Sequence, residues 1–297
     1  METKVMGVLR LAPDMFADNG RSLTRAAVTS GRRMISEGAD IVEIACTPRA
    51  GPPPAEQVAN VVEALAGDAR VALATASPTL AAAATAAGAS LIGVHAMLPG
   101  AAPGGTREAL AGVAAEAGAG WVAVHTAAPV PVTDGEPGGS QSRGGSPSGR
   151  RRSGGGSPSG GRPALVEALE SLEAQGERAG AAGLSEIYLD PGIGCGRSRE
   201  QDLDLLGGLE RLAALGRPLV VGTGDGGLID ELHAAADTRR VPVPDAAAER
   251  DADRLEGALV VAVWAMLAGA AVLRTRHVAA TVEAARIVGA RRPVGAP

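Results

Sequence analysis

The stretch Asp40–Thr75, DIVEIACTPRAGPPPAEQVANVVEALAGDARVALAT, contains two short apolar runs separated by an Ala-rich amphipathic segment. The runs Asp40–Ala45 and Arg70–Thr75 have the length typical of buried strands, whereas the apolar residues of Pro54–Ala66 recur at helical spacing. A glycine follows the amphipathic segment, as is common where a helix ends. The stretch therefore predicts a strand, a helix and a second strand parallel to the first.

The same alternation extends along the whole chain. The strands are expected at Val5–Leu9, Asp40–Ala45, Arg70–Thr75, Ser90–Val94, Trp121–His125, Glu186–Asp190, Pro218–Gly222 and Ala271–Thr275. The helices are expected at Leu23–Glu37, Pro54–Ala66, Thr79–Ala87, Arg107–Ala117, Pro163–Ala174, Arg199–Leu215, Arg254–Ala268 and Ala279–Val288. Eight such units in a chain of this length predict a TIM (β/α)8 barrel formed by residues 1–297 as a single unit. A doubly wound open sheet is the alternative.

The composition agrees with an α/β domain that has one large core. The chain has 297 residues, of which 45% are hydrophobic, and a formal net charge of -5. That charge gives no general attraction to nucleic acid or to an anionic membrane, so a cytoplasmic protein is expected. The run Gly257–Leu273 has no charged residue, but its Ala and Gly content favours a buried helix followed by a strand over a membrane span. The N-terminus does not resemble a secretory signal.

One segment interrupts the alternation. Thr133–Arg162, TDGEPGGSQSRGGSPSGRRRSGGGSPSGGR, is rich in Gly, Ser, Pro and Arg and has almost no apolar residues. Such a composition cannot form a core, so we expect a disordered insertion in the loop after the fifth strand. The run Arg150–Arg152 offers an alternative interpretation in which the insertion binds RNA. A solvated linker is the simpler expectation.

In a TIM barrel the active residues lie at the C-terminal ends of the strands and in the loops that follow. The polar residues that the expected strands place there are Arg10, Glu43, Thr75, His95, His125, Asp190, Thr223, Arg274, Arg276 and His277. The sequence GTGDGG at Gly222–Gly227 follows the seventh strand. It is weak evidence for a phosphate loop because Asp225 would put a negative charge inside it.

Four runs of this chain resemble the signatures of the dihydropteroate synthase family. They are Met6–Gly20 (MGVLRLAPDMFADNG), Gly38–Ala45 (GADIVEIA), Leu189–Gly196 (LDPGIGCG) and Leu273–Val288 (LRTRHVAATVEAARIV). The resemblance covers nearly the whole chain except the insertion. It implies a pterin-binding TIM barrel in which p-aminobenzoate displaces pyrophosphate from 6-hydroxymethyl-dihydropterin pyrophosphate.

The resemblance also implies roles for individual residues. Asp190 matches the family's pterin-binding aspartate, and Arg274 matches the basic residue that meets the pyrophosphate. Glu43 stands where an aspartate is usual, and Arg49 matches the arginine of the second loop if one residue is deleted before it. We therefore expect Asp190, Glu43, Arg49 and Arg274 to bind substrate, and His277 to do so where it substitutes for the family's final histidine.

Several positions depart from the family pattern. Arg10 replaces the asparagine that helps to bind Mg²⁺ in the family, so the cofactor of this chain is unknown from its sequence. Arg276 replaces the histidine of the last strand. Ala74 stands at an aspartate position, and Gly93 begins the pair that replaces an Asn-Asp pair. We expect Arg10, Arg274 and Arg276 to act as catalytic cations that stabilise the departing pyrophosphate.

Two functions remain open at this point. The chain is expected either to be a divergent dihydropteroate synthase or to be a non-catalytic paralogue that binds a pterin or a phosphate. The second is favoured by Gly226, which falls where the family has a lysine. The expected partners are a small pterin or phosphate ligand and a second copy of the chain in a homodimer, with no nucleic acid and no membrane.

Overall fold

The structure is a computed structural model that describes residues 2–11, 21–46, 53–94, 104–126, 163–223, 228–229, 232 and 246–290. Its strands are β1 (Lys4–Leu11), β2 (Ile41–Cys46), β3 (Arg70–Ala74), β4 (Leu91–Gly93), β5 (Gly120–Val124), β6 (Ile187–Asp190), β7 (Val220–Gly222) and β8 (Val272–Thr275). Its helices are α1 (Arg21–Ser36), α2 (Ala55–Ala66), α3 (Pro78–Ala86), α4 (Gly104–Glu116), α5 (Ala164–Ala181), α6 (Arg199–Gly207), α7 (Leu209–Ala213), α9 (Ala246–Leu267) and α10 (Val278–Gly289).

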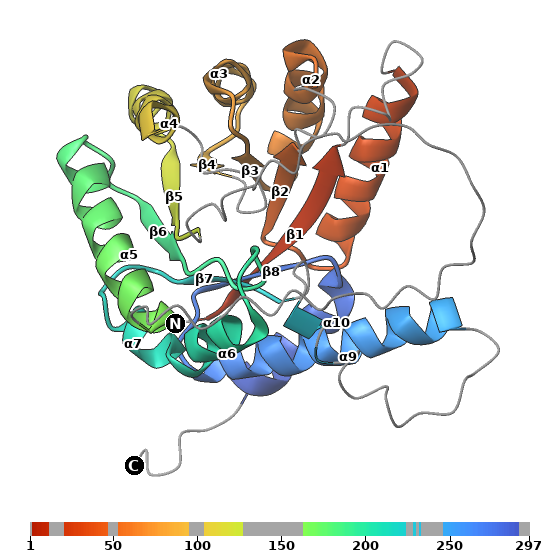
Figure 1. Ribbon diagram of the computed structural model, residues 1–297. Helices are drawn as coiled ribbons and strands as arrows, with labels where there is room; N and C mark the ends of the chain where they lie inside the picture. Colours follow the sequence, from red (N-terminus) through yellow and green to blue (C-terminus); the bar gives the residue numbers. More distant parts are fainter. Residues whose placement is uncertain are drawn as a thin grey trace, which may run out of the picture.

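The strands form a ring surrounded by helices (Figure 1). All the pairs are parallel, and the order β6-β5-β4-β3-β2-β1-β8-β7 follows the chain around the ring. The ring is nearly closed by a bridge between Leu189 and Leu219, where the Leu189 N–H donates to the Pro218 carbonyl at 2.9 Å. The predicted TIM barrel is confirmed. The doubly wound alternative is wrong because the strand order does not reverse at any point of the sheet.

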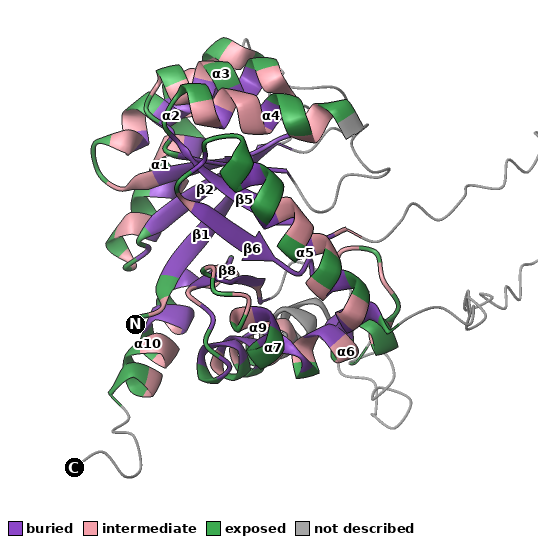
Figure 2. Ribbon diagram, turned by 90° about the vertical axis from the view of Figure 1, so that its left-hand side faces the viewer, coloured by how far each residue is buried: buried purple, intermediate pink, exposed green. Residues whose placement is uncertain are grey.

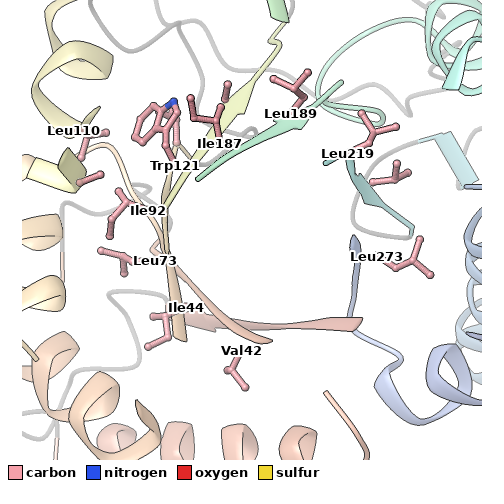
Figure 3. Packing of buried hydrophobic residues seen from close by; sticks show 14 of the residues in the cluster. Val42, Ile44, Leu73, Ile92, Leu110, Trp121, Ile187, Leu189, Leu219 and Leu273 are labelled. Carbon is pink, nitrogen blue, oxygen red and sulfur yellow. The ribbon is translucent and has the colours of Figure 1, made fainter. Parts of the chain in front are cut away.

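Side chains alternate between two faces of each strand, and each face has its own apolar cluster. The outward residues, such as Val42, Ile44, Leu73 and Leu273, pack beneath the helices (Figure 3). The inward residues fill the ring and are Met6, Ile41, Ala72, Leu91, Val122, Val124, Tyr188, Val220 and Val272. Both faces of the strands are therefore buried, whereas the helices expose their outer sides (Figure 2). This arrangement explains why the strands are continuous apolar runs in the sequence.

The segment expected as one helix at Arg199–Leu215 is two helices, which corrects the prediction. α6 ends at Gly207, and Gly208 has φ -96 and ψ 7 before α7 begins. A Cβ at Gly208 would lie 2.3 Å from Leu165 Cδ1 and Cδ2, so a larger residue there would require the Leu165 side chain of α5 to move. The Asp204 carboxylate also accepts the Leu165 N–H at 2.9 Å. Packing against α5 therefore accompanies the interruption.

The N-terminal end of the ring is crossed by an ion pair between β3 and the residue before β6. The Arg70 guanidinium donates to both oxygens of Glu186, at 2.7 and 2.6 Å, and to the Tyr188 hydroxyl at 3.2 Å. Tyr188 in turn donates to Glu186 Oε1 at 2.7 Å. These bonds lower the pKa of Glu186, the bond from Arg70 most of all. Below the apolar cluster, this network forms a polar floor to the barrel.

Two further sequence predictions concern the run Gly257–Leu273 and the insertion 133–162. The run Gly257–Leu273 is the end of α9 followed by the start of β8, as expected. Of the helices in the described ranges, none has the length and apolarity needed to cross a membrane. The predicted insertion 133–162 lies outside the described residues, between the C-terminal end of β5 and the start of α5.

Candidate functional site

Three charged side chains meet inside the C-terminal mouth of the barrel. Asp190 is the last residue of β6, Arg274 lies on β8 and Glu43 lies on β2. Asp190 is 0% exposed and Glu43 is 6% exposed. All three have inward positions, because Asp190 follows Tyr188 by two residues, Arg274 follows Val272, and Glu43 follows Ile41. The sequence predicted that these residues would converge.

Arg274 joins the two carboxyl groups. Its Nη2 donates to Asp190 Oδ2, and its Nη1 lies 3.4 Å from Glu43 Oε1. The guanidinium must pass β7 to reach β6, and the β7 residue in register with Arg274 is Gly222, which has no side chain to obstruct it. We call Asp190, Arg274 and Glu43 the buried charge cluster. Its burial makes each interaction stronger than a surface ion pair.

The loop after β6 holds the Asp190 carboxyl in place. Asp190 Oδ1 accepts the Gly192 N–H at 2.7 Å, so each of its oxygens has a donor. Gly192 has φ +67, a left-handed conformation that favours glycine. A Cβ there would lie 2.1 Å from the His125 carbonyl oxygen, which is too close for any side chain. Gly192 is therefore required both by its backbone conformation and by the approach of β5.

Arg197 and His125 support this loop, and sequence reasoning gave neither of them that role. Arg197 donates to the Gly192 carbonyl at 2.7 Å and to the His125 carbonyl at 3.3 Å. The His125 N–H donates to the Asp190 carbonyl at 2.8 Å. These contacts use backbone atoms, which leave no residue pattern in a sequence. The single available signal was an arginine that follows a glycine-rich turn after a strand.

The buried side chain of His125 is expected to make the fold less stable in acid. His125 is 8% exposed, and its side chain has outward parity on β5. Burial, and then the charges of Arg197 and Arg107, lower its pKa to about 4 from 6.5. Protonation therefore favours the unfolded chain, and stability present above pH 6.5 is lost as the pH falls toward 4. We expect the free energy of unfolding to fall by up to about 3 kcal/mol over this range.

Urea unfolding at a series of pH values measures this effect. The His125→Gln variant keeps the backbone contacts and has no titrating ring, so its stability should change much less over the same pH range. Equal slopes for the variant and the natural chain would contradict the assignment to His125. Carboxyl groups titrate mainly at the acid end of the range and contribute to both proteins alike.

The other predicted site residues are placed as follows. Arg10 is exposed near the end of β1 and has the inward parity of Met6. Arg276 is exposed, two residues after Arg274. His277 lies beyond the end of β8, directly before α10, and its N–H donates to Thr275 Oγ1 at 3.0 Å. Arg49 lies outside the described residues. Arg10 lies near the end of β1 and Arg276 lies just after the end of β8, the adjacent parallel strand, so the two belong to the same side of the mouth.

The described residues of the mouth form no protein cage for Mg²⁺. Mg²⁺ is bound by oxygen ligands, commonly one or two carboxylates together with waters and substrate phosphates. The end of β1 offers a guanidinium, Arg10, which repels a cation. Within the described ranges, no three His, Cys, Asp or Glu side chains lie where they could hold a metal ion. Among the described residues, Arg10, Arg274 and Arg276 supply the positive charge at this mouth.

Thiolate chemistry is also disfavoured. Both cysteines are free, and Cys195 packs on the inward apolar cluster above Asp190. Burial raises the pKa of Cys195 to about 12, with a further contribution from the negative charge of Asp190. Burial likewise raises the pKa of Cys46 to about 12. Both groups are thiols at neutral pH, so neither is an activated nucleophile.

Known proteins resemble this chain over nearly its whole length. The profile of the family described as "Pterin binding enzyme" matches residues 6–276. The dihydropteroate synthase of Staphylococcus haemolyticus is 26% identical over 298 residues, which cover 97% of this chain and 94% of that protein. The Xanthomonas albilineans enzyme in complex with 7,8-dihydropteroate is 27% identical with a TM-score of 0.69, over 98% of this chain and 95% of that one. The Thermus thermophilus enzyme in complex with 6HMPPP gives the same values.

The profile match extends from β1 to the residue after β8, so it includes all three members of the buried charge cluster. The structural similarity likewise extends over the complete ring of strands. A shared fold alone would leave the family open, but here the match also covers the LDPG turn that holds Asp190. This chain is thus a member of the pterin-binding enzyme family, the family of the dihydropteroate synthases.

Proposed function

We propose that this protein is a dihydropteroate synthase-like protein of folate biosynthesis. In the proposed reaction, the amine nitrogen of p-aminobenzoate attacks the methylene carbon of 6-hydroxymethyl-dihydropterin pyrophosphate. A carbon–nitrogen bond forms, the carbon–oxygen bond to pyrophosphate breaks with its electron pair on oxygen, and the amine loses a proton. The observation that supports this function best is the fully buried Asp190 carboxyl, held by Gly192 and Arg274 at the base of the mouth.

The roles proposed for the residues follow from how deeply each side chain is buried in the mouth of the barrel. Asp190 is buried and has the carboxyl group that suits the aminopyrimidine edge of a pterin, with Glu43 beside it. Arg10 and Arg276 are exposed at the rim, where an anionic leaving group would lie. Guanidinium groups stabilise the charge that develops on the leaving pyrophosphate, most strongly where water is excluded. Arg274 lies between the buried carboxyl groups and the arginines of the rim, so we assign it to both the pterin site and the pyrophosphate site.

Arg49 and His277 complete the proposed substrate-binding set. Both assignments rest on the family resemblance of the second loop and of the last strand motif. His277 directly follows Arg276, which is one of the residues proposed to bind pyrophosphate. The proposed reaction takes place in the cytoplasm, and the segment 133–162 is proposed to be a disordered insertion in a single-domain barrel.

A second function, binding of a pterin or a phosphate without turnover, is favoured by one observation. Ala74 and Gly93 are the inward residues in register at the ends of β3 and β4. Neither has a side-chain hydrogen-bonding group, so the ligand edge that faces these strands gains no polar contact from their side chains. A buried N–H or carbonyl without a partner costs about 1–3 kcal/mol. The absence of these hydrogen bonds would weaken binding of the pterin ring.

Two measurements on the purified protein separate these functions. Calorimetry with 6-hydroxymethyl-dihydropterin pyrophosphate reports binding, and release of pyrophosphate in the presence of p-aminobenzoate reports turnover. Binding with turnover is the expected result. Binding without turnover would support the second function, and the absence of binding would overturn both.

Asp190→Asn tests the proposed pterin contact. The amide keeps the shape of the carboxyl but removes its charge and one of its acceptors. Because hydrogen bonds to charged groups contribute about 1.5–3 kcal/mol, we expect the Kd for the pterin substrate to rise about tenfold to a hundredfold. Circular dichroism establishes that the variant is folded. An unchanged Kd would contradict the assignment of Asp190.

We also propose that the chain forms a homodimer through α9. Val260, Trp264 and Leu267 are 66%, 53% and 52% exposed, and their spacing places them on one face of the helix. Neighbouring exposed apolar residues of this kind are typical of protein interfaces. Trp264→Glu is expected to convert a dimer into a monomer in sedimentation experiments, whereas Trp264→Phe should remain dimeric. A monomeric natural chain would overturn this proposal.

A further inference from the structure

The helical layer of the barrel has a groove between α4 and α5. The helix pairs α1 with α2, α2 with α3, and α3 with α4 pack against each other, as Figure 1 shows around the upper part of the ring. Between α4 and α5 there is instead a groove of about 150 Å³. The outward side chain of Trp121 on β5 lies at its base, and the groove is also lined by Arg107, Glu108, Gln175 and Arg178. The groove opens on the outside of the barrel.

Arg107 is held in the groove by neutral groups. Its Nη2 donates to Thr126 Oγ1 at 2.8 Å, and its Nη1 donates to Gln175 Oε1 at 3.4 Å. Gln175 is itself oriented by a bond from its Nε2 to Ser171 Oγ at 3.0 Å. Among the ion pairs between described residues, none includes Arg107. A half-buried guanidinium is thus fixed in position without a carboxylate partner in that part of the chain.

A second guanidinium adds to the positive charge. Arg178 on α5 lines the same groove, and its charge contributes to lowering the pKa of Arg107, after the larger effect of burial. Glu108 raises the pKa of Arg107, and its effect is larger than that of Arg178, but its side chain is exposed and is not an ion-pair partner of Arg107. Two like charges near a partly desolvated surface repel each other, and an anion between them would offset the repulsion. Guanidinium groups bind oxyanions through paired N–H donors.

We infer that the groove between α4 and α5 is a binding site for a small oxyanion of the phosphate type, bound by Arg107 and Arg178. The site is separate from the barrel mouth, because Trp121, Arg107 and Gln175 lie on the outward side of the strands, whereas Asp190 and Arg274 lie inside the ring. The inference therefore does not depend on the proposed enzymatic function.

Nuclear magnetic resonance of the tryptophan side chains tests the inference. Trp121 and Trp264 are the two tryptophans of the chain, so Trp264→Phe leaves the Trp121 indole N–H as a single signal. Titration with inorganic phosphate is expected to shift this signal saturably, and sodium chloride at the same ionic strength should not. Acetate is the comparison for a carboxylate: a stronger response to acetate than to phosphate would contradict the phosphate-type assignment.

Substitutions locate the bound ion. In the Trp264→Phe background, Arg107→Gln is expected to weaken phosphate binding about tenfold or more, since it removes charge-assisted hydrogen bonds. Arg178→Gln should have a smaller effect in the same direction. Arg211→Gln is the matched control, because Arg211 is an exposed arginine on α7 outside the groove, and it should leave the titration unchanged.

The absence of a saturable shift would overturn the inference, as would an equal shift with chloride or an unchanged affinity in both Arg107→Gln and Arg178→Gln. Arg276→Gln at the mouth should leave the Trp121 shift intact. If that variant abolished the shift, the ion would be bound at the mouth and not in the groove.

Discussion

Replacement of Arg274 by methionine is expected to destabilise the fold by about 3–5 kcal/mol, because it leaves two buried carboxyl groups without their shared guanidinium. Asp190 and Glu43 are 0% and 6% exposed, so water cannot replace the lost partner without a rearrangement of the mouth. Binding of pyrophosphate should be lost together with stability. Urea unfolding measures the first effect, and calorimetry with pyrophosphate measures the second.

A neutral triple variant is the control for this prediction. Asp190→Asn, Glu43→Gln and Arg274→Met together remove every charge of the buried charge cluster. Because the cost of the single substitution comes from uncompensated buried charge, the triple variant should recover much of the lost stability. A fall of less than about 1 kcal/mol in the free energy of unfolding of the single Arg274→Met variant would be the size expected for a surface ion pair. That result would contradict the argument from burial.

Gly192→Ala is expected to cost roughly 3 kcal/mol or more, from backbone strain and from a steric clash. The added Cβ would lie 2.1 Å from the His125 carbonyl oxygen, which belongs to the backbone and cannot rotate away. Relief of this clash must move the loop that donates to Asp190. We therefore expect pterin binding to be lost even where the variant remains folded. Thermal unfolding and calorimetry provide the two measurements.

Gly196→Ala separates the two causes. Gly196 also has a positive φ, +84, but nothing lies within 4 Å of a Cβ added there. It should therefore show the conformational strain alone, about 1–2 kcal/mol, with pterin binding preserved. Equal effects of the two substitutions on stability and on binding would indicate that the contact with His125 is unimportant.

Most of the fold could be predicted from the sequence, because strands with two buried faces are continuous apolar runs and the helices between them are amphipathic. Where prediction failed, the cause was contact between distant segments. The break at Gly208 accompanies the approach of Leu165, which comes from another helix and has no local signal. The strand expected at Pro218–Gly222 is also longer than β7, which begins at Val220, although the Pro218 carbonyl still accepts the Leu189 N–H.

For the site, the sequence predicted which charged side chains lie at the C-terminal strand ends. Asp190, Arg274 and Glu43 were placed together because all parallel strands end at the same side of the barrel. It did not predict that Arg274 joins both carboxyl groups, since this depends on which inward positions lie opposite each other. Arg197 was missed because it binds carbonyl groups, and Arg107 because its partners Thr126 and Gln175 come from a strand end and a distant helix.

The polar floor formed by Arg70, Glu186 and Tyr188 lies at the N-terminal end of the barrel, below the inward apolar cluster. A ligand therefore reaches Asp190 from the C-terminal mouth. In the proposed reaction this geometry favours entry of the pterin substrate before p-aminobenzoate, because the second substrate would lie between the pterin and the mouth. Pyrophosphate and the joined product would then leave on the side by which the substrates entered.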